Sequence, residues 1–596
     1  MRFLCYILLG AISFFWSCKS VQAETIILVE NGKGKAEIIV PQGATKQISD
    51  AAAFLQKYVA KSTGAMLPIK MSASIGKIGI HLGQTNYVNN SKVKVNSNNF
   101  EGFVIDLPDS KNLVLLGNSD WGTEYAVYYF LEKFVGILWL MPTELGEEVP
   151  RHSTLKMSVD RIISEEPAFL TRHLAPMNSV NPSNVDDYWG RINRIKKNVE
   201  FNHNLTNLFD YEKYGAGDKQ FYPTLNGRKQ VALKAKHDWQ PNFNDSRLAE
   251  VASKRITEFF KKHPHETSYS LGINDSKNFD QSSESLKSRS GRKNSVGFDD
   301  VSNEYYTWVN EVVRNVNAVY PDKVFGLLAY NNVFDPPSGG LVLDESVIPF
   351  LTSERIRWAN EGFKRKDILH TKSWSRASKR LGWYDYVYGN TYMAPRLWTR
   401  EMGEYLKWAN QNGVRYYVAE LYPNWGEGPK AWVLSRLLWN PEQDVNDLLD
   451  TWYKAFAGTA AAPKVRAYFD LWEGFWSRDI QGSKWYDTNS QYLQLTMLQY
   501  ILDIPKSYIQ ISDKLLSEAY DLAKSDIQRT RIDKLREMWN VYRIAILYKQ
   551  GEPNSRNWTM RSLKNSSELR NALQKLRGDE LHGQISKRLW DGYINK

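Results

Sequence analysis

The spacing of hydrophobic and polar positions changes along the chain and divides it into regions. In residues 24–160, a β-type run at 25–29 precedes an amphipathic stretch at 46–62. Apolar positions three to four residues apart predict one buried helical face there, formed by Ile48, Ala52, Phe54, Leu55 and Val59. Strands ending in glycine are expected at 78–83 and 113–117, and a second helix at 122–134. This order of elements predicts an α+β domain.

Residues 161–435 alternate short apolar runs with amphipathic stretches. The expected helices are 246–262, 302–319 and 399–412; Ser302 is the expected N-cap of the second, which ends before Pro321. The expected strands are 168–173, 205–209, 269–273, 324–329, 356–358, 384–388 and 416–420. The repetition predicts an α/β fold, a (β/α)8-type TIM barrel. An open doubly wound sheet is the alternative, but no glycine-rich nucleotide loop follows any of these strands.

Residues 436–596 have helical spacing and are expected to form a C-terminal helical domain beside the barrel. Helical stretches are expected, from just before this region onward, at 432–438, 445–456, 463–476, 492–500, 507–524 and 526–548.

The first 23 residues have the features of a secretory signal peptide. Arg2 is followed by an apolar run, and Val21-Gln22-Ala23 is a small-x-small cleavage site. Both cysteines, Cys5 and Cys18, lie in this segment, so the mature chain contains none and has no thiol chemistry. An exported protein of this kind fits a bacterial periplasm or cell surface. Lipidation at Cys18 is the alternative to simple export.

Composition adds a weak indication of ligand class. The chain contains 21 Trp, 33 Tyr and 24 Phe, and its formal net charge is +11. Aromatic side chains stack on sugar rings, although a large aromatic core is an equal explanation. The positive charge favours either acidic glycans or simple solubility. No nucleic-acid motif is present.

Asn274-Asp275 is the first candidate for chemistry, because the pair lies at the expected carboxyl end of the strand at 269–273. Catalytic side chains collect at that end of a parallel barrel. Ordinary turn chemistry is the alternative explanation. Glu420 is the second candidate, since it ends the apolar strand at 416–420. It is expected to act as a general acid or to bind sugar hydroxyls, and a salt bridge to an arginine such as Arg172 is the structural alternative. Glu427, on a glycine-rich loop, is expected to be solvated.

Further residues near expected strand ends are candidate substrate contacts. They are Arg172, His173, His203, Tyr330, Asn331, Tyr388, Tyr392, Tyr422 and Trp425. The histidines show no metal-ligand spacing, and the EF-hand pattern is missing, so the sequence predicts neither a metal nor a cofactor.

Two resemblances to known families follow from short motifs. Ala51–Tyr58, Ile80–Gly83, Leu115–Gly117 with Trp121–Thr123, and Phe134–Leu140 resemble the accessory domain that precedes the barrel in hexosaminidases and α-glucuronidases. The ordered motifs Phe221–Arg228, Ser270–Asp275, Tyr305–Val312, Tyr320–Lys323 with Leu328–Tyr330, Ala419-Glu420 and Leu437–Pro441 with Asp444-Val445 resemble domain of unknown function 4838. Part of that family is classed as glycoside hydrolase family 163.

The second resemblance implies a retaining, acetamide-assisted endo-β-N-acetylglucosaminidase acting on N-glycans, with a glycan or glycoprotein as partner. By position it matches Asn274-Asp275 and Glu420 to the family's strand ends, without deciding which carboxylate is the acid. The loop Ser276–Asp280 departs from the glycine-rich, cysteine-containing loop of many relatives. Two alternatives remain: an inverting α-glucuronidase-like hydrolase using Asp275 and Glu420, and a glycan-binding protein without catalysis.

Overall fold

The computed structural model describes residues 24–159, 162–214, 217–230, 238–388, 392–488 and 490–595. The expected signal segment lies outside these residues. The chain divides into two compact units: one holds the described residues up to Gly136 with Val149–Glu166, and the other holds Ile137–Glu148 and everything from Pro167 onward. In the described part of the chain, no helix combines the length and apolar character needed to cross a bilayer.

The first unit is built on a mixed six-stranded sheet in the order β11-β6-β7-β5-β3-β4. A second sheet has the order β10-β1-β2. Helix α1 (Lys46–Thr63) begins at the N-cap Thr45, whose side chain accepts the Ile48 N–H, and ends at Gly64 in the left-handed conformation. The strands are β1 Glu24–Glu30, β2 Lys33–Gly34, β3 Ala36–Ile39, β4 Ile69–Lys70, β5 Ile78–Leu82, β6 Phe103–Asp109, β7 Asn112–Gly117, β10 Leu155–Val159 and β11 Ile163–Glu165, and the other helices are α2 Asn86–Asn89 and α3 Asp120–Phe130.

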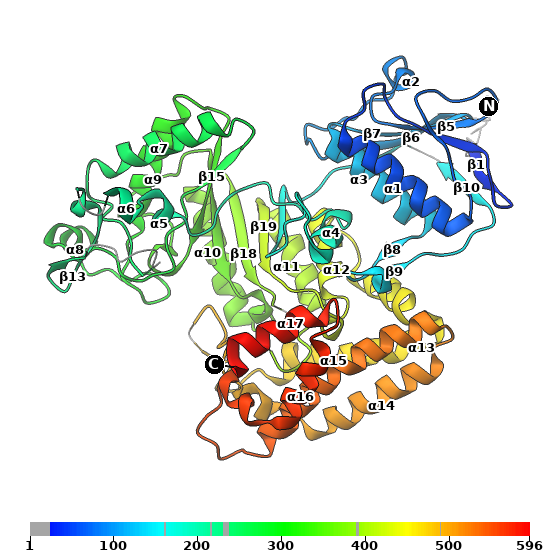
Figure 1. Ribbon diagram of the computed structural model, residues 1–596. Coiled ribbons are helices and arrows are strands. Elements are labelled where there is room, and N and C mark those ends of the chain that lie inside the picture. Colours follow the sequence, from blue (N-terminus) through cyan, green and yellow to red (C-terminus); the bar gives the residue numbers. More distant parts are fainter. Residues whose placement is uncertain are drawn as a thin grey trace, which may run out of the picture. The chain divides into compact units, whose positions relative to one another are not determined.

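The second unit contains a curled, wholly parallel sheet in the order β12-β19-β18-β17-β16-β15 (Figure 1). Its strands are β12 Thr171–Ala175, β15 Ser268–Ser270, β16 Val324–Ala329, β17 Val347–Ser353, β18 Leu381–Tyr386 and β19 Val414–Glu420. The described residues therefore form six strands of this sheet, and the expected eight-stranded barrel is not confirmed.

An irregular segment joins the two edges of this sheet. Lys196 exchanges backbone hydrogen bonds of 2.9 and 2.8 Å with Arg172 of β12. Further along, His203 forms a parallel bridge with Gly272, just past β15. Gly272 permits this approach, because a Cβ there would lie 2.5 Å from the carbonyl oxygen of Asn202. The sheet is thus curled onto itself through single bridges rather than through regular strands.

Large apolar side chains fill the inner face of the curled sheet. Residues of its strands meet Val199 and Phe201 of the irregular segment there in one cluster, to which the strands contribute Leu328, Ile348, Phe350, Tyr416 and Val418. The period of two along each strand places the next inward residue of β19 at Glu420, at the strand's carboxyl end. The packed core therefore ends where the candidate site begins.

Four amphipathic helices alternate with the strands: α7 Leu248–Lys262, α9 Ser302–Asn317, α10 Glu361–Ala377 and α11 Thr399–Gln411. The N-cap of α9 is Val301, so Ser302 is its first residue instead of its cap. Two expected strands are wrong: residues 205–209 contain the short helix α5 (Leu205–Leu208), and residues 356–358 lie in the 3-10 helix η5 (Arg355–Ala359). Strand β17 was not expected, although all seven of its residues are buried.

The smaller elements of this unit connect its main helices and strands. They are β8 Leu138–Trp139, β9 Glu147–Glu148, α4 Val185–Ile192, α6 Tyr211–Tyr214, β13 Thr224–Leu225, β14 Arg228–Lys229 and α8 Ser283–Arg289.

The C-terminal helices belong to the same compact unit as the curled sheet. They are α12 Lys430–Trp439, α13 Val445–Gly474, α14 Lys506–Leu522, α15 Asp526–Gln550, α16 Ser567–Leu576 and α17 His582–Leu589. Helices α13, α14 and α15 pack on one another (yellow to orange in Figure 1). Gly458, with φ 77° and ψ 160°, breaks α13 into two parts, as the sequence predicted. The helix expected at 492–500 is a loop that leads into the 3-10 helix Gln499–Asp503.

Candidate active site

Asp275 lies just beyond the carboxyl end of β15. The backbone leading to it from Leu271 to Asn274 is buried, whereas the Asp275 side chain is exposed. Tyr330, which follows β16, donates its hydroxyl to Oδ1 of Asp275 at 3.2 Å. A short buried strand therefore presents one carboxylate at its end, next to a tyrosine from the neighbouring strand.

Asn274 has no exposed surface. Its Oδ1 accepts the backbone N–H of Thr206 at 2.9 Å, and its Nδ2 donates to the carbonyl of Trp239 at 2.8 Å. Both ends of the amide are thus engaged with backbone. The expectation that this amide faces a substrate is not supported by these contacts, and the residue instead holds Asp275 in place.

Gln240 is a supporting residue that the sequence did not reveal. Its side chain is fully buried and accepts the Asn274 N–H at 3.1 Å. Its Nε2 donates to the carbonyls of Asn274 and Ser276, at 2.7 and 2.8 Å. A lone glutamine in a polar stretch carries no pattern, so only the fold shows that it clamps the backbone on both sides of Asp275.

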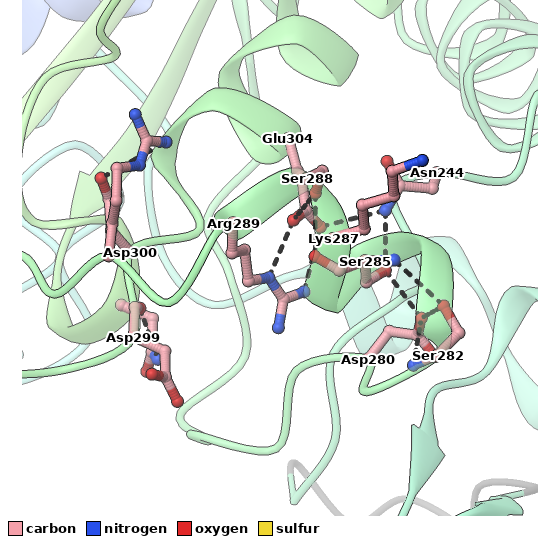
Figure 2. A network of polar contacts seen from close by, with 12 residues as sticks. Asn244, Asp280, Ser282, Ser285, Lys287, Ser288, Arg289, Asp299, Asp300 and Glu304 are labelled. Atoms are coloured by element: carbon pink, nitrogen blue, oxygen red, sulfur yellow. Dashed lines mark hydrogen bonds and ion pairs between the residues drawn. The ribbon is translucent and has the colours of Figure 1, made fainter.

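The loop after Asp275 is held by a polar network, drawn in Figure 2. Asp280 accepts the Ser285 hydroxyl at 2.8 Å. It also accepts the backbone N–H of Thr224. In the same network, Arg289 binds Glu304 through two hydrogen bonds of 2.8 and 3.0 Å. The serine-rich stretch is therefore an ordered support for the strand end.

Glu420 lies at the carboxyl end of β19. The Tyr384 hydroxyl of β18 donates to its Oε1 at 2.7 Å, and its backbone carbonyl accepts the Tyr388 N–H at 2.5 Å. Burial raises the pKa of Glu420, and the charges of Glu354 and Asp275 raise it further, while the Tyr384 hydrogen bond opposes them. A carboxyl group in these surroundings retains its proton to higher pH than an exposed one.

Tyr330 connects the two carboxyl groups electrostatically. Burial raises the pKa of Tyr330 to about 12, and the negative charges of Asp275 and Glu420 contribute to the shift. The charge of Asp275 in turn acts on Glu420. Asp275, which follows β15, is therefore close enough to Glu420 of β19 to influence the ionisation of Glu420, although the two strands are not neighbours in the sheet.

A group of tyrosines surrounds Glu420. The ring of Tyr386 lies 5.2 Å from that of Tyr384, 5.7 Å from that of Tyr388 and 5.0 Å from that of Tyr492. Burial raises the pKa of Tyr386 well above its ordinary value, so its hydroxyl stays neutral. Tyr388 adopts a positive φ of 39°. Together these rings form an aromatic wall with neutral hydroxyl groups. The sequence did not identify Tyr384, Tyr386 and Tyr492 as members of this wall.

Arg172 and His173 are buried in β12 and do not have the exposed positions expected of substrate contacts. The Arg172 guanidinium donates to the carbonyls of Arg194 and Phe169, at 2.8 and 2.7 Å. Burial lowers the pKa of His173 to about 3, so its ring is neutral. Both side chains contribute to the interior of the sheet.

Three further candidates are also buried. Tyr392 donates to Glu354 at 3.3 Å, and Trp425 packs its ring 5.8 Å from that of Phe456. Asn331 is 6% exposed, and its carbonyl accepts a hydrogen bond from Asn294 at 2.7 Å. These contacts are structural and differ from the substrate contacts expected.

His203 and Tyr422 are partly exposed near the two carboxylates. His203 contacts the carbonyl of Ile273 through Nδ1, and its ring centre is 6.1 Å from that of Tyr330. Tyr422 stacks against Arg588 of α17 at 3.8 Å. Both remain predicted substrate contacts.

Two buried ion pairs support the ends of β17 and β18. Glu354 pairs with Arg396 and accepts the Leu493 N–H at 2.6 Å. Glu427 pairs with Lys430 and is 3% exposed, so the expectation that Glu427 is solvated is wrong. Desolvation lowers the pKa of Lys430 to about 8. Its ammonium also donates to the Tyr388 carbonyl at 2.9 Å, which holds the loop after β18.

One group of potential metal ligands occurs within the described residues: Glu537, Asp579 and His582. Lys534 pairs with Glu537 at 2.9 Å and with Asp579 at 2.8 Å. One ammonium group therefore already pairs with both carboxylates.

Comparison with known proteins adds a family and a fold. The model of the family "Domain of unknown function (DUF4838)" matches residues 141–470, more than half of the chain. The chain belongs to the DUF4838 family. The match covers β12 to β19, and so both Asp275 and Glu420. No curated protein matches this DUF4838 chain.

Solved structures of two glycoside hydrolases resemble this DUF4838 protein. One is a family GH115 4-O-methyl-α-glucuronidase with specificity for decorated arabinogalactans, at 13% identity and a TM-score of 0.55, covering 94% of this chain and 78% of that one. The other is a GH138 enzyme targeting pectin rhamnogalacturonan II, at 11% identity and a TM-score of 0.44, covering 93% and 92% of the two chains. The first likeness shows a shared fold. The second, with its lower TM-score, supports no inference about the fold or the function.

Proposed function

We propose that this DUF4838 protein is a glycoside hydrolase in which Glu420 is the general acid and Asp275 is its ionised partner. The observation that carries the proposal is the pair itself. Two carboxyl groups lie at strand ends, each accepts a tyrosine hydroxyl, and burial raises the pKa of one of them. Glycosidases use such pairs, in which one acid is protonated and the other carboxylate is charged.

The preferred reaction is acetamide-assisted cleavage of an N-acetylglucosaminide, with retention of configuration. The substrate's own acetamide oxygen attacks the anomeric carbon, and the Glu420 proton passes to the leaving oxygen. The Asp275 carboxylate accepts the acetamide N–H. Water then opens the cyclic intermediate, with Glu420 as the base. The resemblance of the sequence motifs to endo-acting enzymes supports N-glycans as substrate.

A uronic-acid substrate is the second candidate, supported by Arg588. Its guanidinium stacks on Tyr422, two residues beyond Glu420. Arginine is well suited to bind a sugar carboxylate. In this case the reaction is an inverting hydrolysis, in which Asp275 activates water and Glu420 protonates the leaving group.

One experiment separates these candidates. The protein is incubated with sialylated and desialylated N-glycoproteins and with glucuronic-acid-bearing oligosaccharides, and the products are analysed by mass spectrometry. Release of a glycan one N-acetylglucosamine short, blocked by a thiazoline analogue of the cyclic intermediate, supports assisted N-glycan cleavage. Cleavage of uronides alone favours the second candidate. Binding of either substrate without cleavage indicates a non-catalytic glycan-binding protein.

We also propose that the protein is exported. The apolar run and small-x-small site before Glu24 support cleavage after Ala23. N-terminal sequencing of protein from the cell envelope is expected to begin at Glu24. A lipid-modified N-terminus at Cys18 would instead support anchoring to the membrane.

A further inference from the structure

A cavity of about 840 Å³ lies beyond the carboxyl ends of β16 and β17. Its walls come from residues 334–336 after β16, from η5, from one face of α10 and from Asp487, Thr488, Ser490 and Gln491. Neither Asp275 nor Glu420 lines it. The volume lies in the range of small-molecule binding sites. The cavity therefore has the size of a ligand site but is separate from the two carboxylates.

Buried polar atoms without partners line this cavity. Gln491 is 7% exposed and Arg357 is 5% exposed. Within the described residues, Oε1 of Gln491, Nε of Arg357 and Oγ1 of Thr488 have no hydrogen-bond partner. The Arg357 guanidinium is fixed by a 2.8 Å hydrogen bond from Nη2 to the Thr488 carbonyl. Buried polar groups are normally satisfied. These three atoms have almost no exposed surface, so they reach a ligand in the cavity after a small rotation of their side chains.

The same cavity contains a rigid flat surface. The rings of Phe334 and His370 are stacked 3.9 Å apart and are nearly parallel, at 3°. His370 is also held by a 3.0 Å contact from Nε2 to the Phe334 carbonyl. Flat rings beside hydrogen-bonding groups fit a sugar, whose ring has an apolar face and whose hydroxyls both donate and accept.

The charges of the lining favour an uncharged ligand. Arg357 and Lys366 are the cationic residues, and Asp335, Asp367 and Asp487 are the anionic ones. Two of the acids have partners: Asp367 binds Arg355 at 3.1 Å, and Asp335 accepts the Ser295 N–H at 2.7 Å. The cavity therefore has no excess of positive charge that would select a uronate or sulfate group.

Gln491 also links the cavity to the candidate active site. Its Nε2 donates to the Tyr492 hydroxyl, which is also 2.8 Å from the Thr352 hydroxyl. The Tyr492 ring lies 6.2 Å from that of Tyr330, the tyrosine that binds Asp275. Only the thickness of one side chain thus separates the cavity wall from the aromatic wall of the site.

We propose that this cavity is a second glycan-binding pocket, which takes roughly one to three neutral sugar rings of a substrate branch. The Phe334–His370 face supports the sugar ring, and Gln491, Arg357 and Thr488 bind its hydroxyls. The choice of a sugar as ligand rests on the proposed glycosidase function. The pocket is separate from the two carboxylates, so binding and turnover can be measured independently.

The test uses the full-length protein and a panel of N-acetylglucosamine, mannose, galactose and glucuronic acid, monitored by saturation-transfer NMR and calorimetry. Ser373→Phe places a bulky ring in the cavity. Ser375→Phe on the same helix is the matched control, because Ser375 is exposed and its hydroxyl makes the same bond to the carbonyl three residues earlier. Thr488→Val removes one unpartnered hydroxyl while keeping the side-chain shape.

We expect at least one neutral sugar to bind, with affinity reduced about tenfold or more by Ser373→Phe and several-fold by Thr488→Val, and unchanged by Ser375→Phe. Turnover of a short aryl glycoside is expected to stay the same in all three variants. If no neutral sugar binds, or if Ser373→Phe leaves the binding intact, the proposal that this cavity binds a glycan is wrong. If the three variants affect sugar binding as expected but no substrate is hydrolysed, the proposed glycosidase function is wrong and the proposed glycan-binding pocket stands.

Discussion

At the residue scale, the two carboxyl groups of the candidate site differ in their surroundings. Asp275 is exposed and accepts one tyrosine hydroxyl, whereas Glu420 is partly buried beneath a group of tyrosines. Desolvation and two neighbouring negative charges favour the neutral form of Glu420. This asymmetry assigns the proton to Glu420 in the proposed reaction and makes the pH dependence of the rate a direct test.

The Tyr384 and Asp275 variants are expected to move the alkaline limb of the pH–rate profile in opposite directions. Glu420 acts in its protonated form, so activity is lost as pH rises through its pKa. Tyr384→Phe removes a hydrogen bond that lowers the pKa of Glu420, so the limb moves to higher pH. Asp275→Asn removes a negative charge that raises the pKa of Glu420, so the alkaline limb of the residual activity moves to lower pH. Shifts of the same sign would contradict the assignment.

Glu420→Gln is expected to reduce kcat by about 10²–10⁴-fold, the range attributed to general acid catalysis. Sugar binding should remain within a few-fold, because the amide has nearly the same shape as the acid. The measurement is kcat and KM on an aryl glycoside and on a glycoside with a poorer leaving group. The loss is expected to be smaller for the better leaving group, which needs less protonation. Equal losses on both substrates would argue against an acid role.

The sequence predicted the two carboxylates because each ends an apolar strand, which is a local pattern. It did not predict the buried state of Asn274 or Arg172, because their partners Trp239 and Arg194 come from other parts of the chain. Gln240 and Tyr384 were missed for the same reason. A residue's position along a strand is visible in its neighbours, whereas the direction of its hydrogen bonds depends on tertiary contacts.

At the element scale, the loop after β15 depends on the network of Figure 2. The Arg289 and Glu304 side chains are 7% and 6% exposed. Glu304 also accepts hydrogen bonds from Ser288 and Asn244. The pair fastens α8 to the start of α9, and so holds the chain that leaves Asp275.

Arg289→Ala is expected to lower the free energy of unfolding by about 3–5 kcal/mol, because it leaves the Glu304 carboxylate buried without its cation. Lys293→Ala is the control, since Lys293 and Asp299 form a 2.6 Å pair whose side chains are 59% and 60% exposed. Such surface pairs contribute about 0–1 kcal/mol. Urea unfolding followed by tryptophan fluorescence measures both variants, and equal losses would show that the buried pair has no special role.

Helices with one apolar face, such as those at 302–317 and 399–411, were predicted within about two residues, because their period is a property of the segment itself. Strand β17 was missed because its residues are buried on both faces and show no alternation. The segment Ile356–Trp358 has the alternating pattern of a strand, yet Arg357 donates hydrogen bonds to the distant carbonyls of Thr488 and Ser490. The elements that the sequence failed to predict are those whose structure depends on contacts with distant parts of the chain.

At the scale of the whole molecule, the curled sheet and the C-terminal helices form one compact unit, although the sequence suggested a boundary near residue 435. The indole of Trp476 donates to the Pro395 carbonyl at 2.6 Å, and a Cβ at Gly428 would lie 2.4 Å from the ring of Phe469. Leu493 binds Glu354, and Tyr492 contributes to the aromatic wall. The helical region therefore completes both the core and the candidate site.

A chain ending after Asn440 is accordingly expected to be insoluble or to lack fixed tertiary structure. It loses α13–α15, leaves Trp425 without its Phe456 contact and removes the Leu493 donor from buried Glu354. A chain ending after Asn565 keeps those helices, so it should stay soluble, with a moderate loss of stability. Size-exclusion chromatography and near-UV circular dichroism compare the two with the full-length protein. A soluble monomer with native near-UV signal from the shorter chain would show that the sheet folds without the helices. The contacts of Tyr492 and Leu493 would then serve only to shape the site.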